Sequence, residues 1–489
     1  MPEGNMANIR LTVLGAGASG TAIARMASRM GADVFVSDAA KIAPETAKFF
    51  ETAGIRYEEK GHTEKIFDCD RAIVGSGFPP TAPVLERLAS KGITPVGELD
   101  FVMPFVKGRV IGVTGSNGKT TTASLLGHLL KVEGANCEVA GNIGKPIADI
   151  QIRRQKTAGS ARARRGACFP DPFEKGSRGP VPLRGTDAHR PDAPTGSPDY
   201  TVLELSSFQL HWASAVKFAG AIVTNLAPDH IDWHGSCENY VRAKAKLVGF
   251  VERGGFAIVQ KRDRETFKIG EVSARYLTWD APFADDDIFL SLEKASAVMD
   301  GKELFRFGET RLLGTHNMEN TSMAMGMVNM LGLGNAARAS LPSYTAPAHR
   351  CGLVLEKNGV RYIDDSKGTN IAASVAAMSA IDGPHLVILG GRGKGENYGG
   401  LAEPLKKYAK HAYLIGEAAS EIAASLSLAG CDNFSVSGDM ENAVKEAVSA
   451  ARPGDSVLLS PACASWDAYR NYNERGDHFA ALARKHAGA

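Results

Sequence analysis

Short apolar runs alternate with longer stretches of helical periodicity along most of the chain, which is the pattern of an α/β protein. In the first block, a β-like run leads into a glycine-rich loop, a helical pattern that extends to Met30, and a second β-like run. This order is a βαβ unit, and it predicts a Rossmann-like domain over residues 1–101. The strands expected in this block are 10–14, 33–38, 71–74 and 94–96.

The rest of the chain divides into two further α/β blocks. The second block, 102–346, contains continuous apolar runs of the type buried in a parallel sheet, and we expect a P-loop ATPase-like domain with a parallel or mixed sheet. The third block, 347–489, alternates strands with alanine-rich helical stretches and predicts a second Rossmann-like domain. The strands expected are 200–205, 220–225 and 255–260, then 360–363, 386–389, 412–415 and 456–459.

Residues 151–198 interrupt the second block. They include eight arginines and seven prolines and almost no aliphatic residues. Such a segment cannot bury enough apolar surface to offset the entropy of ordering, so we expect a disordered insertion. A basic patch that binds nucleic acid is the alternative interpretation. Three doublings of loop length cost only about 2 kcal/mol, which a surface loop of the domain tolerates.

The strongest chemical signal is the sequence GVTGSNGKTTT at 112–122, which lies between an apolar strand and a helical stretch. In such a loop, backbone N–H groups and the helix N-terminus hold phosphate, a lysine balances its charge and a hydroxyl reaches Mg²⁺. Val113 stands where the general ATPase pattern has glycine. We still expect a nucleoside triphosphate here, with a simple glycine turn as the alternative.

A second glycine loop, GAGASG at 15–20, follows the first strand, and Asp38 lies about 20 residues further on, as in a dinucleotide-binding fingerprint. Taken alone, this pattern suggests NAD and therefore an NAD-dependent oxidoreductase. The loop indicates pyrophosphate binding more securely than it indicates NAD. An oxidoreductase would also leave the lysine loop at 118–120 without a role.

Polar residues follow two of the buried strands. Glu204 ends one strand, where a carboxylate costs several kcal/mol unless it has a partner, so a metal or another cation is expected. Asp229 and His230 follow the next strand. Because the carboxyl ends of parallel strands share one edge with the phosphate loop, we favour His230 as a ligand over a purely structural histidine.

Two helical patterns add candidates. Lys244 lies on a helical stretch, where its position alone suggests an ordinary surface lysine. Asn317 and Asn320 lie one helical turn apart and face the same way, which suits two amides that hold a base or brace the nucleotide. Helix capping is the alternative role for Asn317.

Composition and charge narrow the class of protein. The net charge of +2 gives no indication of nucleic-acid binding. Seven scattered cysteines without a C-x-x-C pair indicate neither a disulfide framework nor a zinc site. No apolar run reaches the length of about 18 residues that spans a membrane, and no signal-peptide pattern opens the sequence. We expect a cytoplasmic, monomeric protein without membrane insertion.

The motifs follow one another as GSNGKT, GNIG, LELSSFQL, NxxxDHxD, GxHNxxN, HR, DDSKGTN and LLSPACAS. This order resembles the Mur ligases over nearly all of the chain outside 151–198. The segments at 204–209 and 460–465 are most similar to those of the D-glutamate-adding members. The resemblance implies three domains and an ATP-dependent, ADP-forming ligase of peptidoglycan precursor synthesis. It would add D-glutamate to UDP-N-acetylmuramoyl-L-alanine through an acyl phosphate.

The resemblance also implies site residues. Those for catalysis are Lys119, Glu204, His230 and Lys244. Those for ATP are Gly115, Ser116, Asn117, Gly118, Lys119, Thr120, Thr121, Asn317, Asn320, Arg350 and Asp365. Those for the UDP-sugar are Gly17, Ala18, Ser19, Asp38, Gly77, Asn142 and Ser206. Those for D-glutamate are Lys367, Thr369, Lys394, Ser465 and Tyr472.

Two Mg²⁺ ions are implied as well. Thr120 and Glu204 would hold one ion, and His230 and Lys244 would serve the other, with Lys244 carbamylated. A carbamate adds a negative charge beside the metals, where an ammonium group would be repelled. Neighbouring cations also lower the pKa of a lysine from about 10.4 and so favour the neutral amine that reacts with CO₂.

Several residues depart from the family pattern. Gly368, Trp466 and Tyr472 replace a common alanine, leucine and phenylalanine around the expected amino-acid pocket. A ligase of altered specificity, adding L-glutamate, is therefore an alternative. A non-catalytic binding protein disabled by the insertion is a further one, although the insertion lies between motifs and interrupts none.

Overall fold

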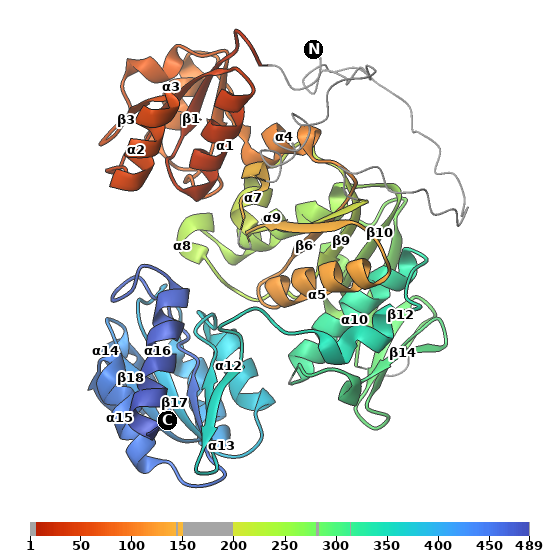
Figure 1. Ribbon diagram of the computed structural model, residues 1–489, viewed down its shortest axis with the longest axis vertical. Helices are drawn as coiled ribbons and strands as arrows, with labels where there is room; N and C mark the ends of the chain where they lie inside the picture. Colours follow the sequence, from red (N-terminus) through yellow and green to blue (C-terminus); the bar gives the residue numbers. More distant parts are fainter. Residues whose placement is uncertain (1–5, 143–144, 150–198, 280–282, 313, 489) are drawn as a thin grey trace.

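The computed structural model describes residues 6–142, 145–149, 199–279, 283–312 and 314–488. Three sheets, each built from a consecutive part of the chain, form three lobes (Figure 1). The predicted three-domain α/β fold is confirmed. The insertion expected at 151–198 lies outside the described residues.

The N-terminal lobe contains a five-stranded parallel sheet in the order β3-β2-β1-β4-β5. Helices α1, α2 and α4 pack on one face and α3 on the other. The strand order reverses between β1 and β4, so the glycine loops that follow these two strands meet at the carboxyl edge of the sheet. The bounds are β1 Arg10–Leu14, β2 Asp33–Ser37, β3 Arg56–Glu58, β4 Arg71–Val74, β5 Val96–Gly97, α1 Ala18–Arg29, α2 Pro44–Ala53, α3 Pro83–Ser90 and α4 Glu98–Val102.

The central lobe contains a nine-stranded mixed sheet in the order β14-β13-β12-β11-β10-β9-β6-β8-β7. Its strands pair in parallel from β7 to β12, while β13 and β14 are antiparallel. The strand bounds are β6 Arg109–Thr114, β7 Cys137–Gly141, β8 Tyr200–Glu204, β9 Phe218–Val223, β10 Val251–Gln260, β11 Ser273–Thr278, β12 Asp287–Ser291, β13 Ser296–Met299 and β14 Lys302–Arg306.

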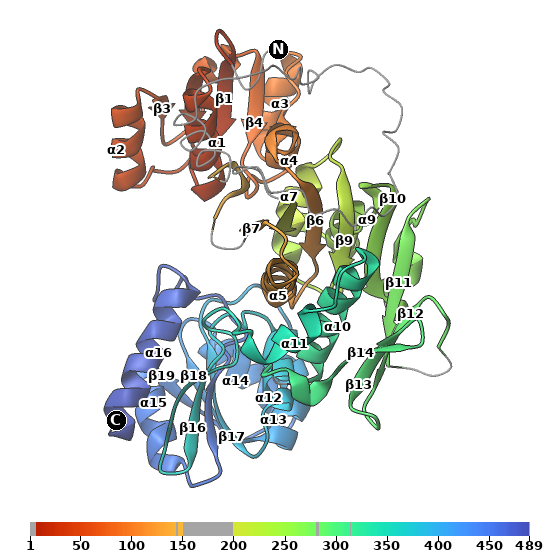
Figure 2. The same cartoon turned by 45° about the vertical axis from the view of Figure 1, so that its right-hand side comes forward.

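Helices cover both faces of this central sheet. Figure 2 shows α5 and α10 between the central sheet and the C-terminal lobe. The two helices share one apolar core with the central sheet. Helix α9 packs on the opposite face, whose core is continuous with that of the N-terminal lobe. The bounds are α5 Lys119–Val132, α7 Ser207–Trp212, α8 Ile231–His234, α9 Cys237–Gly249, α10 Thr315–Met330 and α11 Ala337–Ser340.

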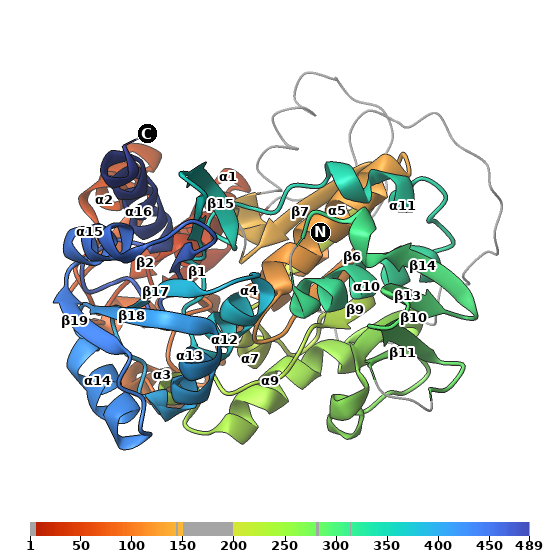
Figure 3. The same ribbon diagram turned by 90° about the horizontal axis from the view of Figure 1, so that it is seen from below.

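The C-terminal lobe contains a six-stranded sheet in the order β15-β16-β20-β17-β18-β19, in which only β15 is antiparallel to its neighbour. Helices α15 and α16 cover one face and α12, α13 and α14 the other (Figure 3). The bounds are β15 Gly352–Lys357, β16 Val360–Asp364, β17 His385–Gly390, β18 Ala409–Ile415, β19 Phe434–Gly438, β20 Ser456–Leu459, α12 Ile371–Ala380, α13 Ala402–Tyr408, α14 Ala419–Leu428, α15 Met440–Ala450 and α16 Tyr472–Ala487.

Most predicted strands are present with shifted ends. The strand expected at 94–96 is instead the two-residue edge strand β5. The apolar pattern does not predict β11 to β14, because these are short strands at one side of the central sheet and β14 contains three charged residues. Within the described part of the chain, no helix has the length and apolarity required to cross a bilayer.

Two indole rings join the N-terminal lobe to the central lobe. The Trp212 indole N–H donates to the Phe78 carbonyl oxygen at 3.1 Å, and the Trp233 indole N–H donates to the Gly77 carbonyl oxygen at 3.4 Å. The chain also approaches closely at Gly97, where a β-carbon would lie 2.6 Å from the Trp212 carbonyl oxygen. The loop after β4 is therefore fixed against the central lobe.

Candidate active site

The loop between β6 and α5 has the geometry of a phosphate cradle. Gly115 and Gly118 have φ values of +142° and +81°, which a residue with a side chain rarely adopts. A β-carbon on Gly118 would lie 2.2 Å from Oδ1 of Asn320. Asn225 holds the loop by accepting from the backbone N–H of Asn117 at 2.9 Å and donating to its carbonyl oxygen at 3.1 Å.

Lys119 begins α5 and folds back over the loop. Its Nζ donates to the carbonyl oxygens of Gly115 at 2.9 Å and Ser116 at 2.8 Å. Burial lowers the pKa of Lys119, and the carboxylates of Glu204 and Asp229 oppose that change. The side-chain nitrogen of Lys119 lies over the loop at the N-terminus of α5, a position that favours the binding of phosphate.

Glu204 ends β8 directly beside Val113 of β6, so its buried side chain lies at the phosphate loop. Its Oε1 accepts from Nδ2 of Asn142 at 3.3 Å. Its Oε2 is buried and has no hydrogen-bond partner among the described residues. An unsatisfied carboxylate oxygen beside a phosphate cradle suits a divalent cation.

The described residues contain no group of three His, Cys, Asp or Glu side chains arranged to hold a metal. Glu204 brings a carboxylate to the phosphate loop, and Mg²⁺ usually takes one or two carboxylates and completes its shell with phosphate oxygens and water. The Thr120 hydroxyl lines the same cavity as Glu204 and is a further oxygen donor there.

Lys244 is buried, with only 2% of the residue exposed, which is contrary to the surface position suggested by the sequence. It lies on the buried stripe of α9, and its Nζ donates to the Gly115 carbonyl oxygen at 2.7 Å. Burial, together with the charge of Lys119, lowers the pKa of Lys244 well below its ordinary value. The Lys244 amine therefore points at the phosphate loop, in surroundings that favour its neutral form.

His230 lies after β9 in the left-handed conformation, with φ of +51°. Its ring contacts Phe208, and its Nε2 lies 3.7 Å from Oδ2 of Asp229. Burial and the charges of the nearby lysines together lower the pKa of His230 to about 4, against the opposing charge of Asp229. The imidazole is thus neutral near pH 7 and able to act as a ligand.

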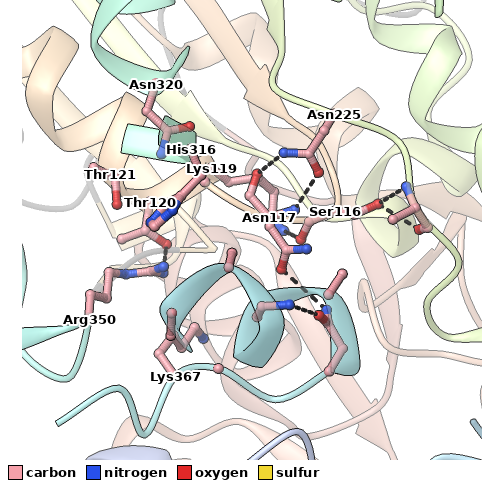
Figure 4. Close-up of a pocket in the computed structure, with 18 of the residues that line it drawn as sticks. Ser116, Asn117, Lys119, Thr120, Thr121, Asn225, His316, Asn320, Arg350 and Lys367 are labelled. Atoms are coloured by element: carbon pink, nitrogen blue, oxygen red, sulfur yellow. Dashed lines mark hydrogen bonds between the residues drawn. The ribbon is translucent and has the colours of Figure 1, made fainter. Parts of the chain in front are cut away.

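The C-terminal lobe closes over this loop. The Arg350 guanidinium donates to the Thr120 hydroxyl (Figure 4), and Nδ2 of Asn370 donates to Oδ1 of Asn117 at 3.3 Å. Lys394 and Asp229 form an ion pair between the two lobes. The structure therefore has the third lobe in contact with the phosphate loop.

The chain around Arg350 has an unusual backbone conformation. His349 and Cys351 on either side of it have φ values of +63° and +47°. The His349 ring is held 2.7 Å from Oδ2 of Asp364 at the end of β16. Non-glycine residues in this region are uncommon, and here they direct the Arg350 side chain toward the central lobe.

Two adjoining cavities lie between the central and C-terminal lobes. The first, of about 380 Å³, is lined by the phosphate loop and by most of the residues expected to bind ATP, including Asn317, Asn320, Arg350 and Asp365. The two amides are hydrogen-bonded to each other at 3.1 Å, and Asn317 is not the N-cap of α10. Burial raises the pKa of Asp365, which accepts from the Ser460 hydroxyl, to about 7.

The second cavity, of about 260 Å³, is lined by all five residues expected for D-glutamate: Lys367, Thr369, Lys394, Ser465 and Tyr472. It shares Lys119, Asn142, Asp229, His230, Lys367 and Thr369 with the first cavity. Nζ of Lys367 lies 3.9 Å from the centroid of the Tyr472 ring, and burial together with the charge of Arg350 lowers the pKa of Lys367 to about 7.

The residues expected for the UDP-sugar divide into two groups. Asn142 and Ser206 line the second cavity. Gly17, Ala18, Ser19, Asp38 and Gly77 are not among the residues that line either cavity and lie on the loops and the first turn of α1 at the carboxyl edge of the N-terminal sheet. The Asp38 carboxylate is hydrogen-bonded to the Ala16 backbone N–H at 2.6 Å, within the first glycine loop.

Sequence reasoning did not select three residues that the geometry places at the site. They are Asn225, which holds the phosphate loop, and Asp229 and Asn370, which meet between the lobes. All three stand in motifs with recognisable spacing, NxxxDHxD and DDSKGTN. The motifs could therefore have pointed to these three residues. The contact between Asp229 and Asn370 becomes evident only in the folded protein, where the two lobes meet.

Comparison with known proteins identifies the family of the chain. The family models described as MurD N-terminal domain, Mur ligase middle domain and Mur ligase glutamate ligase domain match residues 10–84, 183–328 and 349–463. A UDP-N-acetylmuramoylalanine--D-glutamate ligase of Fervidobacterium nodosum is 31% identical over 98% of this chain and 99% of its own. The chain belongs to the Mur ligase family.

Other Mur ligases are similar over comparable lengths. A ligase of the same name from Solibacter usitatus is 33% identical, over 96% of both chains. Among solved structures, the UDP-N-acetylmuramate-alanine ligase of Thermotoga maritima has a TM-score of 0.57 with 15% identity, covering 98% of this chain and 100% of that one. At this identity the structural likeness shows the fold alone.

Proposed function

We propose that this Mur ligase joins D-glutamate to UDP-N-acetylmuramoyl-L-alanine with cleavage of ATP to ADP and phosphate, in the synthesis of peptidoglycan precursors. The observation that carries the proposal is the pair of adjoining cavities. One contains the phosphate loop, the other contains Lys367, Lys394 and Tyr472, which suit an acidic amino acid, and Lys119 and His230 border both.

The proposed reaction follows from this adjacency. The terminal carboxylate of the UDP-sugar substrate attacks the γ-phosphate of ATP, and ADP leaves. The amine of D-glutamate then attacks the resulting acyl phosphate, and phosphate leaves as the amide forms. Positioning and charge neutralisation supply most of the rate in phosphoryl transfer. Lys119 and Arg350 are placed to bear the phosphate charge.

Mg²⁺ would be held by Thr120 and Glu204, and when bound it would neutralise phosphate charge beside Lys119. The orphaned Oε2 of Glu204 supports this assignment. We assign a second ion to His230 and to a carbamylated Lys244. The neutral imidazole and the buried amine, whose pKa is lowered well below its ordinary value, support that assignment.

The remaining site residues belong to the same proposal. Lys394 and Lys367 would pair with the carboxylates of D-glutamate, with Thr369, Ser465 and Tyr472 forming the rest of the pocket. The glycine loops with Asp38 and Gly77 would bind the UDP moiety. We place the domain boundaries after residues 101 and 346, and we place the protein in the cytoplasm, where its nucleotide substrates are made.

The test is phosphate release with ATP, Mg²⁺ and UDP-N-acetylmuramoyl-L-alanine, comparing D-glutamate, L-glutamate and no amino acid. Release that depends on D-glutamate is the expected result. Release with L-glutamate alone would contradict the assigned specificity while keeping the reaction type. Release under none of the three conditions would contradict the ligase assignment itself.

A further inference from the structure

A buried arginine lies behind the second cavity. Arg475, on the second turn of α16, is 1% exposed and is among the largest fully buried side chains of the protein. Its Nε donates to Oγ of Ser366 at 3.0 Å, and its Nη2 donates to the Ser366 carbonyl oxygen at 2.8 Å. Its Nη1 donates to the carbonyl oxygens of Cys463 and Ala464, both at 3.1 Å.

All the hydrogen bonds found for this guanidinium thus end on neutral oxygens. Among the described residues it has no ion pair, although a buried charge is costly without one. Burial lowers the pKa of Arg475 to about 10, so the group is still positive near pH 7. A fixed positive charge is therefore held inside the C-terminal lobe, next to the segments that line the second cavity.

Those segments are the ones expected to hold the amino acid. Ser366 precedes Lys367, and Ala464 precedes Ser465. The Ser366 hydroxyl also donates to the Tyr472 carbonyl oxygen at 2.8 Å.

Ala464 extends the connection to a third loop. It exchanges two backbone hydrogen bonds with Arg392, at 2.9 and 3.0 Å, two residues before Lys394. One guanidinium thereby links, directly or through one neighbour, the segments that carry Lys367, Ser465, Tyr472 and Lys394.

We propose that Arg475 is the positioning residue that sets the spacing of the amino-acid pocket, and that its buried charge makes the pocket prefer an acceptor with an anionic side chain. The inference rests on the proposed function, because it needs an amino-acid substrate in the second cavity. A planar guanidinium can hold three carbonyl oxygens and a hydroxyl at once, whereas a lysine ammonium cannot reproduce this fork.

Two substitutions separate geometry from charge. Arg475→Lys keeps the charge and loses the fork, so the KM for D-glutamate should rise at least about tenfold, as expected for ligand groups displaced by a fraction of an ångström. The KM for ATP should stay within about twofold, because this residue does not touch the phosphate loop. Arg475→Gln also removes the charge, and it should lower the preference for D-glutamate over D-glutamine by a further factor of about ten.

Two further variants complete the design. Ser366→Ala removes the hydroxyl between Arg475 and Tyr472 without a change of charge, so it should raise the KM for D-glutamate and leave the D-glutamate to D-glutamine preference unchanged. If Arg475→Gln does not fold, Arg475→Lys and Ser366→Ala still decide the positioning role. Arg484→Lys, an exposed arginine on the same helix, is the matched control.

The outcomes are distinct. Wild-type protein without D-glutamate-dependent phosphate release would contradict the proposed function, and this inference with it. An active wild type whose Arg475→Lys and Ser366→Ala variants keep the wild-type KM for D-glutamate would overturn the inference alone. A parallel rise in the KM values for ATP and D-glutamate, with a lowered melting temperature, would indicate a purely structural role and would also overturn it.

Discussion

Lys394 of the C-terminal lobe lies with its Nζ 3.4 Å from Oδ1 of Asp229 in the central lobe. The two side chains are 13% and 9% exposed, so the pair is largely removed from water. Asp229 also faces Asn370 and the ring of His230. The pair therefore joins the lobes at the point where the two cavities meet.

Asp229→Asn should weaken this closure. Removing one partner leaves the Lys394 ammonium buried and unpaired, a change that costs about 3–5 kcal/mol in buried pairs and less where water can enter. Small-angle scattering of the protein without substrates should show a larger radius of gyration. Lys406→Met, which breaks an exposed pair within the C-terminal lobe, is the control. An unchanged radius would show that other contacts hold the lobes together.

Lys119→Met should remove most of the ligase activity. Without its charge over the phosphate loop, the value of kcat/KM for ATP should fall by about 10²–10³, as for other lost electrostatic contacts to a reacting group. Lys131→Met, near the end of the same helix and away from the cavities, should leave activity unchanged. Retention of activity in the Lys119 variant would exclude this loop as the phosphate site.

Lys244→Ala should be inactive and should recover part of its activity when short carboxylates such as acetate are added. The buried amine of Lys244 is the group that we expect to react with CO₂, and a small carboxylate can occupy the space left by the side chain. Depletion of CO₂ should also lower wild-type activity reversibly. Failure of every short carboxylate to restore activity would count against the carbamate.

Asp365→Asn should change how stability depends on pH. Burial raises the pKa of Asp365 to about 7, so the folded state binds a proton more tightly than the unfolded chain does. This contribution is present below about pH 4 and is lost as the pH rises toward 7. The variant lacks it, so wild-type stability should fall relative to the variant by up to about 1.4 kcal/mol per pH unit in that window. Unfolding in urea at several pH values measures the difference, and a constant difference would contradict the prediction.

The sequence predicts the elements better than their contacts. Periodicity is local, so the strands that carry Glu204 and the phosphate loop are found from it, and so is the edge of the sheet at which they meet. The surface position that the sequence suggested for Lys244 is wrong. Tyr240, Ala243, Leu247 and Val248 are buried on the same side of α9, and a lysine within that stripe is a signal of burial that the spacing already contained.

Contacts between lobes are beyond such patterns. Nothing in the sequence around Lys394 indicates Asp229, which lies 165 residues earlier. Arg475 is a similar case, since its five neighbours on each side include three charged residues and would place it on a surface. Arg475 is buried because the segments that carry its carbonyl partners enclose it. These segments come together only in the folded C-terminal lobe.

The indole bridges between the first two lobes have an optical consequence. Trp212 and Trp233 donate to the loop after β4, Trp466 lines the amino-acid cavity, and Trp279 is the remaining tryptophan of the four. Three of the four tryptophans therefore stand where the proposed substrates would bind. Quenching or a spectral shift of the native emission can report nucleotide-sugar and amino-acid binding separately, without any attached dye, once single Trp→Phe variants have assigned each signal.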